Sequence, residues 1–328
     1  MTMCIVWGGV FVLVCCVAAV SHATPLSLRI TGEDETLRLD AELGHQTTSY
    51  QVNGLQDLQT LYLQLETDQV DEHTFAPLLR TFGAQVFDPI ASLMASASEI
   101  EFVIAAHLLR LPLDLLYVNQ QPLFLQRPVT YCFAKTKRAA PEFSFARTLS
   151  ALIISDQTAD PDKGAYFLKQ LLPASAEYYD SNAIHLRQLQ ALPPTDLLLL
   201  SVHSLGDECD DAADALKLGD EEIVPEHLAR LAPKLVYIDA CQFGVSDRFM
   251  QHFRNAGTIY YLAPITSNEI GVSSTKTIRW FFQAFQSGST PPRALFLARR
   301  KLYAYFKPRG DFASLLWRAF PFRIYRLN

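Results

Sequence analysis

Several motifs that identify common enzyme classes are missing from this sequence. Its 328 residues contain no glycine-rich phosphate loop, no H-E-x-x-H zinc motif and no G-x-S-x-G nucleophile elbow. These absences argue against nucleotide hydrolysis, zinc proteolysis and α/β-hydrolase chemistry. The six cysteines include no C-x-x-C pair, so we expect neither a structural zinc site nor a disulfide scaffold. The sequence therefore predicts a protein without a metal or a cofactor.

An excess of positive charge is also missing. The chain has 28 Lys and Arg against 34 Asp and Glu, which gives a formal net charge of −6. Binding to nucleic acid requires a clustered basic face, so nucleic acid is not an expected partner. With 49% hydrophobic and 19% charged residues, the composition is typical of a globular protein.

The N-terminus has the character of an export segment. Residues 4–20 form an uncharged, mostly apolar run, and small residues at Ser21 and Ala23 fit the cleavage site of a secretory signal. The run is short for a transmembrane helix, which needs about 20 residues. We therefore predict a signal peptide over residues 1–23 and a periplasmic or secreted protein. Because no Lys or Arg precedes the run, the alternative is an uncleaved anchor formed by residues 4–20, which would place the protein at a membrane.

The pattern of apolar residues divides the rest of the chain. Residues 24–74 are predicted to be a small β-rich region, because two period-two runs flank a plausible hairpin turn at residues 32–34. From residue 75 onward, short uniformly apolar runs alternate with helical stretches. Strands without polar alternation are typical of a parallel sheet buried on both faces. The sequence thus predicts an α/β fold over residues 75–306, doubly wound and mostly parallel, with helices on both faces. Residues 307–328 form a basic, aromatic tail.

Two of the predicted strands end in reactive side chains. The run D-L-L-L-L-S-V leads into His203, and the run K-L-V-Y-I-D-A leads into Cys241. Ligands of an open parallel sheet bind outside the carboxyl ends of its strands. If the two strands are neighbours, the sheet brings a cysteine nucleophile and a histidine base to the same edge.

The residues around this pair resemble a known family. S-V-H-S at Ser201–Ser204 and D-A-C-Q-F-G at Asp239–Gly244 are similar to the His and Cys motifs of CHAT-domain proteins, which share the caspase-like fold with caspases, metacaspases and separase. The segment Phe102–Leu116 is similar to the opening of many CHAT domains, and the resemblance spans about residues 75–305.

The resemblance implies a cysteine endopeptidase that acts on a protein or peptide substrate. His203 and Cys241 are the implied catalytic dyad, and the backbone N–H groups of Ser204 and Cys241 the implied oxyanion hole. Asp239 matches an aspartate that helps metacaspases select a basic P1 residue. Without that role, Asp239 caps the end of its strand by accepting backbone hydrogen bonds.

One departure from the family pattern leaves a second function open. The family has glycine after the histidine, where this chain has Ser204. Glycine reaches backbone angles that serine adopts only at a cost of about 1–2 kcal/mol. The alternative is therefore a catalytically impaired pseudopeptidase that serves as a binding or regulatory module. The sequence leaves the oligomeric state open.

Overall fold

The computed structural model describes residues 24–33, 35–67, 70–132, 143–205 and 215–328. The predicted export segment, residues 1–23, lies outside this part of the chain. None of the helices in these ranges combines the length and the apolar character needed to cross a membrane.

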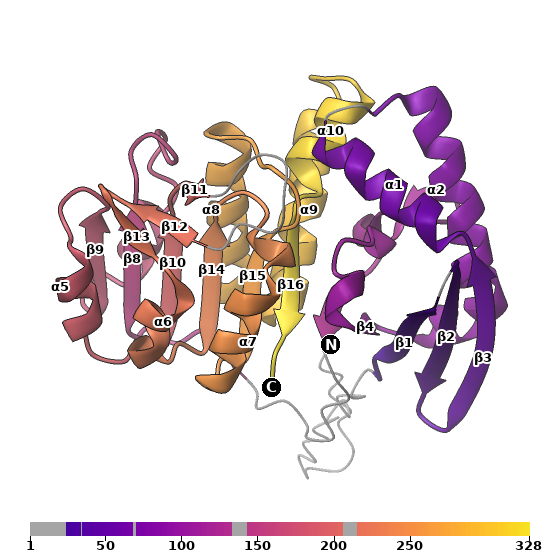
Figure 1. The fold of residues 1–328 in the computed structure, drawn as a ribbon, viewed down its shortest axis with the longest axis horizontal. Helices are drawn as coiled ribbons and strands as arrows, with labels where there is room; N and C mark the ends of the chain where they lie inside the picture. Colours follow the sequence, from indigo (N-terminus) through magenta and orange to yellow (C-terminus); the bar gives the residue numbers. More distant parts are fainter. Residues whose placement is uncertain (1–23, 34, 68–69, 133–142, 206–214) are drawn as a thin grey trace, which may run out of the picture.

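Eleven strands form one large mixed sheet (Figure 1), in the order β3-β2-β1-β4-β7-β16-β15-β14-β10-β8-β9. Most neighbouring pairs from β4 to β9 are parallel, and the pairs β1–β2, β2–β3 and β15–β16 are antiparallel. The strands of this sheet are β1 (Leu26–Glu33), β2 (Thr36–Leu43), β3 (Gln46–Asn53), β4 (Ile100–Ile104), β7 (Val129–Cys132), β8 (Ala151–Ser155), β9 (Ala176–Asp180), β10 (Leu197–Ser201), β14 (Leu235–Asp239), β15 (Tyr260–Pro264) and β16 (Phe322–Arg326).

Smaller β elements lie in the connections. A three-stranded sheet follows β10, and a two-stranded hairpin precedes β7. They consist of β11 (Ser204–Leu205), β12 (Ala215–Leu218) and β13 (Glu221–Ile223), and of β5 (Tyr117–Val118) and β6 (Gln121–Pro122).

Helices cover both faces of the sheet, as the uniformly apolar strands predict. One apolar core lies between the sheet and α4, α8 and α9, and a second includes side chains of α5, α6 and α7. The helices are α1 (Leu55–Glu66), α2 (Glu72–Phe87), α3 (Ala91–Ser96), α4 (Tyr166–Leu171), α5 (Leu186–Ala191), α6 (Pro225–Leu228), α7 (Asp247–Asn255), α8 (Val272–Gln286), α9 (Pro291–Phe306) and α10 (Phe312–Ala319). The predicted class, an α/β fold with a mostly parallel sheet and a β-rich N-terminal region, is confirmed.

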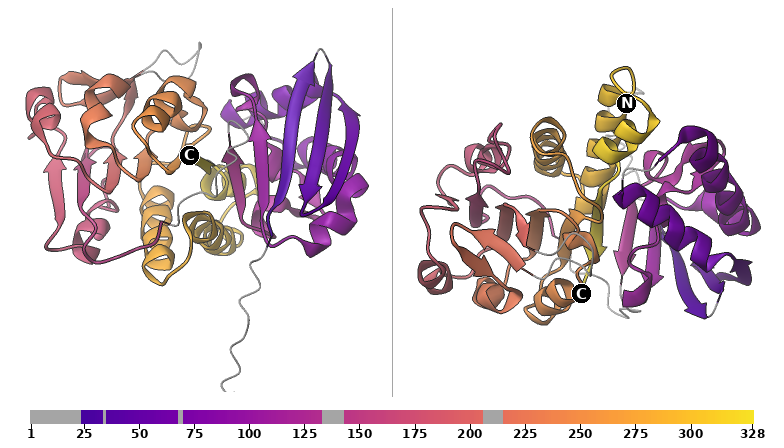
Figure 2. Two further views of the ribbon diagram at one scale, coloured as in Figure 1. Left: turned by 90° about the horizontal axis from the view of Figure 1, so that it is seen from below. Right: turned by 45° about the horizontal axis from the view of Figure 1, so that its top comes forward.

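The N-terminal region joins the main sheet. The predicted hairpin is present as β1 and β2, but β1 also pairs in parallel with β4, so the sheet continues across the predicted boundary at residue 74. The same region contains α1, which follows Gly54 in the left-handed conformation (φ 97°). Figure 2 shows these N-terminal strands and helices packed as one end of the molecule.

The C-terminal residues lie at the centre of the sheet. After α10, strand β16 inserts between β7 and β15, antiparallel to β15 and parallel to β7. Residues 307–328 were predicted to be a tail, yet their last strand links the two halves of the sheet (Figure 1).

A buried ion cluster fixes this strand. Asp114 accepts from Arg299 at 2.8 Å and from Arg323 at 3.2 Å, and all three side chains are almost fully buried. Burial opposes ionisation of Asp114, but the two guanidinium groups outweigh it and hold its pKa below the ordinary value. The basic residues of the C-terminal segment therefore serve, in part, to bind the core.

Candidate functional site

His203 and Cys241 lie just beyond the ends of two neighbouring strands. β10 and β14 are parallel, and Ser201 stands opposite Asp239 in their register. The N–H of Val202 donates to the carbonyl of Asp239 at 3.3 Å, so the pairing extends beyond the last strand residue. The prediction that the two strands are neighbours is confirmed. Both reactive residues are half-buried.

A short hydrogen-bonded chain orients the imidazole of His203. Its Nε2 lies 2.8 Å from the hydroxyl of Thr158, and that hydroxyl donates to Asp156 at 2.5 Å. A hydroxyl has one proton to donate, so Nε2 must be the donor to Thr158. This network assigns the tautomer protonated at Nε2 and leaves Nδ1 unprotonated, as a base requires.

Asp156 is suited to act as the final acceptor in this series of hydrogen bonds. Burial opposes its ionisation, but hydrogen bonds from the hydroxyl and the backbone of Thr158 lower its pKa, with help from Ser181. The Ser181 hydroxyl donates to the second carboxylate oxygen at 3.0 Å. Asp156 thereby holds Thr158, and through it the imidazole of His203, in a fixed orientation.

The thiol of Cys241 faces the loop after β15. Burial raises its pKa most; the nearby Asn268 backbone and Ser267 side chain lower it, and the charges of Asp239 and Glu66 raise it further. The net effect is a raised pKa, so the resting thiol is protonated at neutral pH. Both side chains of the predicted dyad are described, and no hydrogen bond joins the imidazole to the thiol.

Ser204 has ordinary strand geometry. It belongs to β11 and pairs with Leu216, and its φ angle is not positive. Because Lys217 N–H donates to His203 O at 2.9 Å, the adjoining Ser204–Leu216 pair is a non-hydrogen-bonded pair. The Ser204 N–H therefore points away from β12, and no glycine-like conformation is needed at this position. The expected backbone strain does not occur.

The strained residue lies after the cysteine instead. Gln242 has φ 63° and ψ 4°, a left-handed conformation that costs a residue with a Cβ about 1–2 kcal/mol. Its N–H donates to Thr266 O at 3.3 Å. Strained residues of this kind occur at functional turns, where the surrounding structure holds them.

Asp239 is buried, with only 4% of its surface exposed. It accepts from Ser201 at 2.7 Å, from the amide of Asn268 at 2.9 Å and from the hydroxyl of Ser274. Burial raises its pKa to about 6, against the effect of these hydrogen bonds. In the described part of the chain, every donor to the Asp239 carboxylate is a side chain, so these residues do not show the strand-end capping by backbone hydrogen bonds that the sequence offered as the alternative.

A second buried carboxylate, Asp160, lies close enough to Asp239 to raise its pKa further. Asp160 is 1% exposed and accepts from the N–H groups of Gly164 and Ala165 at 2.6 and 2.8 Å. Its own pKa is raised by burial. Among the described residues, neither Asp160 nor Asp239 forms an ion pair, although buried carboxylates normally pair with a cation.

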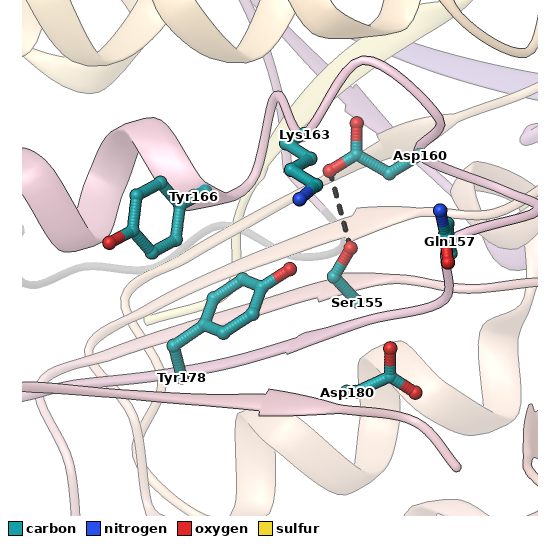
Figure 3. A pocket seen from close by; sticks show the side chains of 7 residues that line it. All are labelled: Ser155, Gln157, Asp160, Lys163, Tyr166, Tyr178 and Asp180. Carbon is teal, nitrogen blue, oxygen red and sulfur yellow. Dashed lines mark hydrogen bonds between the residues drawn. The ribbon is translucent and has the colours of Figure 1, made fainter. Parts of the chain in front are cut away.

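Asp160 lines a pocket of about 470 Å³ at the carboxyl ends of β8 and β9 (Figure 3). Ser155 lies at its base, opposite Ser201 in the strand register, and donates to Asp160 at 3.2 Å. Figure 3 shows the side chain of Lys163 reaching into the pocket from the loop before α4. The lining residues are Ser155, Gln157, Asp160, Lys163, Tyr166, Tyr178 and Asp180.

The sequence analysis missed Thr158, Asp156, Asp160 and Glu66. A usable signal existed for two of them, because Asp156 and Asp160 lie in the loop that follows the uniformly apolar run of β8, and ligand-binding residues gather at such strand ends. No local pattern marks Glu66, which reaches the site from the N-terminal region.

The described residues contain no group of three or more His, Cys, Asp and Glu side chains suited to binding a metal. Cys132 is buried within β7, and Cys209 lies outside the described ranges. Comparison with protein-family models gives no match, and comparison with curated proteins gives none either.

Proposed function

We propose that this protein is a cysteine endopeptidase with Cys241 as nucleophile and His203 as general base and acid. The observation that carries the proposal is the position of these residues at the ends of neighbouring strands, with the imidazole oriented by Thr158 and Asp156. A nucleophile, a base and a third group that orients the base form the usual arrangement for covalent catalysis.

The reaction follows from these positions. Nδ1 of His203 takes the thiol proton as the Cys241 sulfur attacks the carbonyl carbon of the scissile peptide bond. The backbone N–H groups of Ser204 and Cys241 bind the oxyanion. The imidazolium then gives its proton to the departing amine, which leaves a thioester on Cys241. Water, deprotonated by His203, hydrolyses the thioester and restores the thiol.

The carboxylates favour a substrate with a basic P1 side chain. Among the residues that the structure describes, Asp239 and Asp160 are buried without a cation, and an arginine or lysine side chain of the substrate would supply that charge. The pocket beside Asp160 has room for such a side chain, which would displace the exposed ammonium of Lys163. A bound cation would also offset the charge of Asp239, which raises the pKa of Cys241, and so favour thiolate formation.

Labelling with an acyloxymethylketone probe that carries arginine at P1 tests this proposal. We expect wild type to form a covalent adduct and to cleave an arginine-P1 peptide. Cys241→Ala should lose both, and His203→Ala should lose cleavage. Cys132→Ala, at the other cysteine among the described residues, is the matched control and should keep both activities. Absence of labelling and cleavage in folded wild type would refute the peptidase and favour the binding or regulatory module.

The remaining parts of the proposal concern location. Export to the periplasm or secretion, with membrane anchoring by residues 4–20 as the alternative, is tested by sequencing the mature N-terminus. Thr24 is the expected first residue after cleavage.

A further inference from the structure

Glu66, the last residue of α1, contacts two segments beside the candidate nucleophile: the turn that follows Cys241 and the loop that follows β15. Its Oε1 accepts from the side-chain amide of Gln242 at 2.6 Å and from the Ser267 hydroxyl at 2.8 Å. The Ser267 N–H lies 3.3 and 3.2 Å from the two carboxylate oxygens. One carboxylate thus binds two segments that are 176 and 201 residues away in the chain.

These two segments determine the surroundings of the Cys241 thiol. Gln242 follows the cysteine in a left-handed conformation, which requires neighbours that hold it there. On the other side, Ser267 and Asn268 of the loop after β15 lie close enough to the sulfur to lower the pKa of the thiol. A carboxylate that bridges Gln242 and Ser267 therefore fixes the turn after the nucleophile against the loop that the thiol contacts.

A second contact from the same helix supports this bridge. The hydroxyl of Tyr62, one turn before Glu66, donates to the carbonyl of Ile265 at 2.9 Å. Tyr62 is buried and Glu66 is half-buried, so α1 is anchored on the loop after β15 rather than resting on its surface. Helix α1 belongs to the N-terminal region, outside the segment that contains the dyad.

The charge of Glu66 acts on the same thiol. Among the groups that face Cys241, two are carboxylates, Asp239 from the end of β14 and Glu66 from α1, and both favour the protonated thiol. The third titratable neighbour along the sheet edge is His203, at the end of β10. Removing the charge of Glu66 while keeping its shape should therefore make the thiolate easier to form.

We propose that Glu66 is a positioning residue for Cys241, through which the N-terminal helix α1 holds the nucleophile turn and the facing loop in place. The catalytic consequence rests on the proposed peptidase function, whereas the structural claim concerns only the thiol and its two flanking segments.

Two variants separate the bridge from the charge. Glu66→Gln keeps the length of the side chain and removes the charge, and Glu66→Ala removes both. Glu72→Gln is the matched control, because Glu72 is an exposed glutamate at the start of α2. The rate of iodoacetamide alkylation of Cys241 is measured across pH, with Cys241→Ala as the blank for the other cysteines.

We expect the alkylation midpoint of Glu66→Gln to fall by about half a pH unit or more relative to wild type and Glu72→Gln. Glu66→Ala should show a similar fall and, in addition, a loss of kcat/KM of at least about 10-fold for an arginine-P1 peptide. Full kcat/KM together with an unchanged alkylation profile in Glu66→Ala would overturn the proposal, because the thiol would then keep its position without the bridge. If wild type cleaves no peptide, the peptidase function fails, and the alkylation profile of Glu66→Ala against wild type still decides whether Glu66 positions the thiol.

Discussion

Replacing Asp239 by asparagine should stabilise the protein at neutral pH. The substitution keeps the shape of the side chain: the amide oxygen accepts from Ser201 and Ser274, and the amide nitrogen donates to the Asn268 oxygen once that amide turns over. It removes a charge that is buried without a cation among the described residues. Burial raises the pKa of Asp239 from 3.8 to about 6. The folded protein therefore holds this proton more tightly than the unfolded chain does.

The direction and size of the effect follow from that difference. Between pH 4 and pH 6 the folded state binds more protons at this site, so the contribution of Asp239 to the free energy of unfolding falls as pH rises. It is fully present below pH 4 and lost above pH 6. A difference of about 2 pKa units, at about 1.4 kcal/mol each, amounts to about 3 kcal/mol. Wild type should lose this stability across the interval, and Asp239→Asn should not.

Urea unfolding of both proteins at a series of pH values from 4 to 7.5 measures the difference directly. The free energy of unfolding of Asp239→Asn minus that of wild type should rise from near zero at pH 4 to about 3 kcal/mol at pH 7.5. Titrating groups that do not interact with Asp239 cancel in this comparison. Asp180→Asn, at an exposed carboxylate at the end of β9, is the control and should show no such rise.

A difference that does not change with pH would refute the reasoning, because it would mean that Asp239 already has a cationic partner in the folded protein. The same variant should lose about 30-fold or more in kcat/KM for an arginine-P1 peptide, since the substrate cation loses its partner. If the buried charge of Asp239 serves to bind the basic side chain of the substrate, Asp239→Asn should both stabilise the protein and weaken its preference for arginine at P1.

Two further substitutions test other parts of the structure. Lys163→Ala removes the cation that reaches into the pocket beside Asp160, so kcat/KM for an arginine-P1 peptide should rise by roughly 3- to 10-fold, and no change would mean that the substrate does not enter this pocket. Arg299→Ala leaves buried Asp114 with one guanidinium partner fewer and should lower the free energy of unfolding by about 3–5 kcal/mol in urea titrations. A loss below about 1 kcal/mol would show that Arg323 alone suffices.

The position of the dyad could be predicted because its signal is local. The residues preceding His203 and Cys241 are short, uniformly apolar runs, and such runs in α/β order form neighbouring parallel strands more often than not. The chain direction within a parallel strand then fixes which edge the following residue occupies. No knowledge of side-chain contacts was needed for this step.

The C-terminal segment shows where local pattern gives too little information. Residues 322–326 form a five-residue strand with a buried arginine, so composition alone predicts a basic, aromatic tail. The charge of Arg323 is compatible with the core only because Asp114, more than 200 residues earlier, lies against it. A pairing over that distance leaves no periodic trace in the sequence.

By itself, the sequence determined the α/β class, the strands that carry His203 and Cys241, and the edge of the sheet on which both occur. These properties depend on the alternation of apolar runs and helical stretches, which each segment expresses on its own. Only the tertiary structure decided that Thr158 orients the imidazole, that Asp160 lies near Asp239 with no cation beside them in the described part of the chain, and that Glu66 bridges Gln242 and Ser267. Each of these contacts joins segments far apart in the chain, or depends on burial, which follows from how the whole sheet and its helices pack.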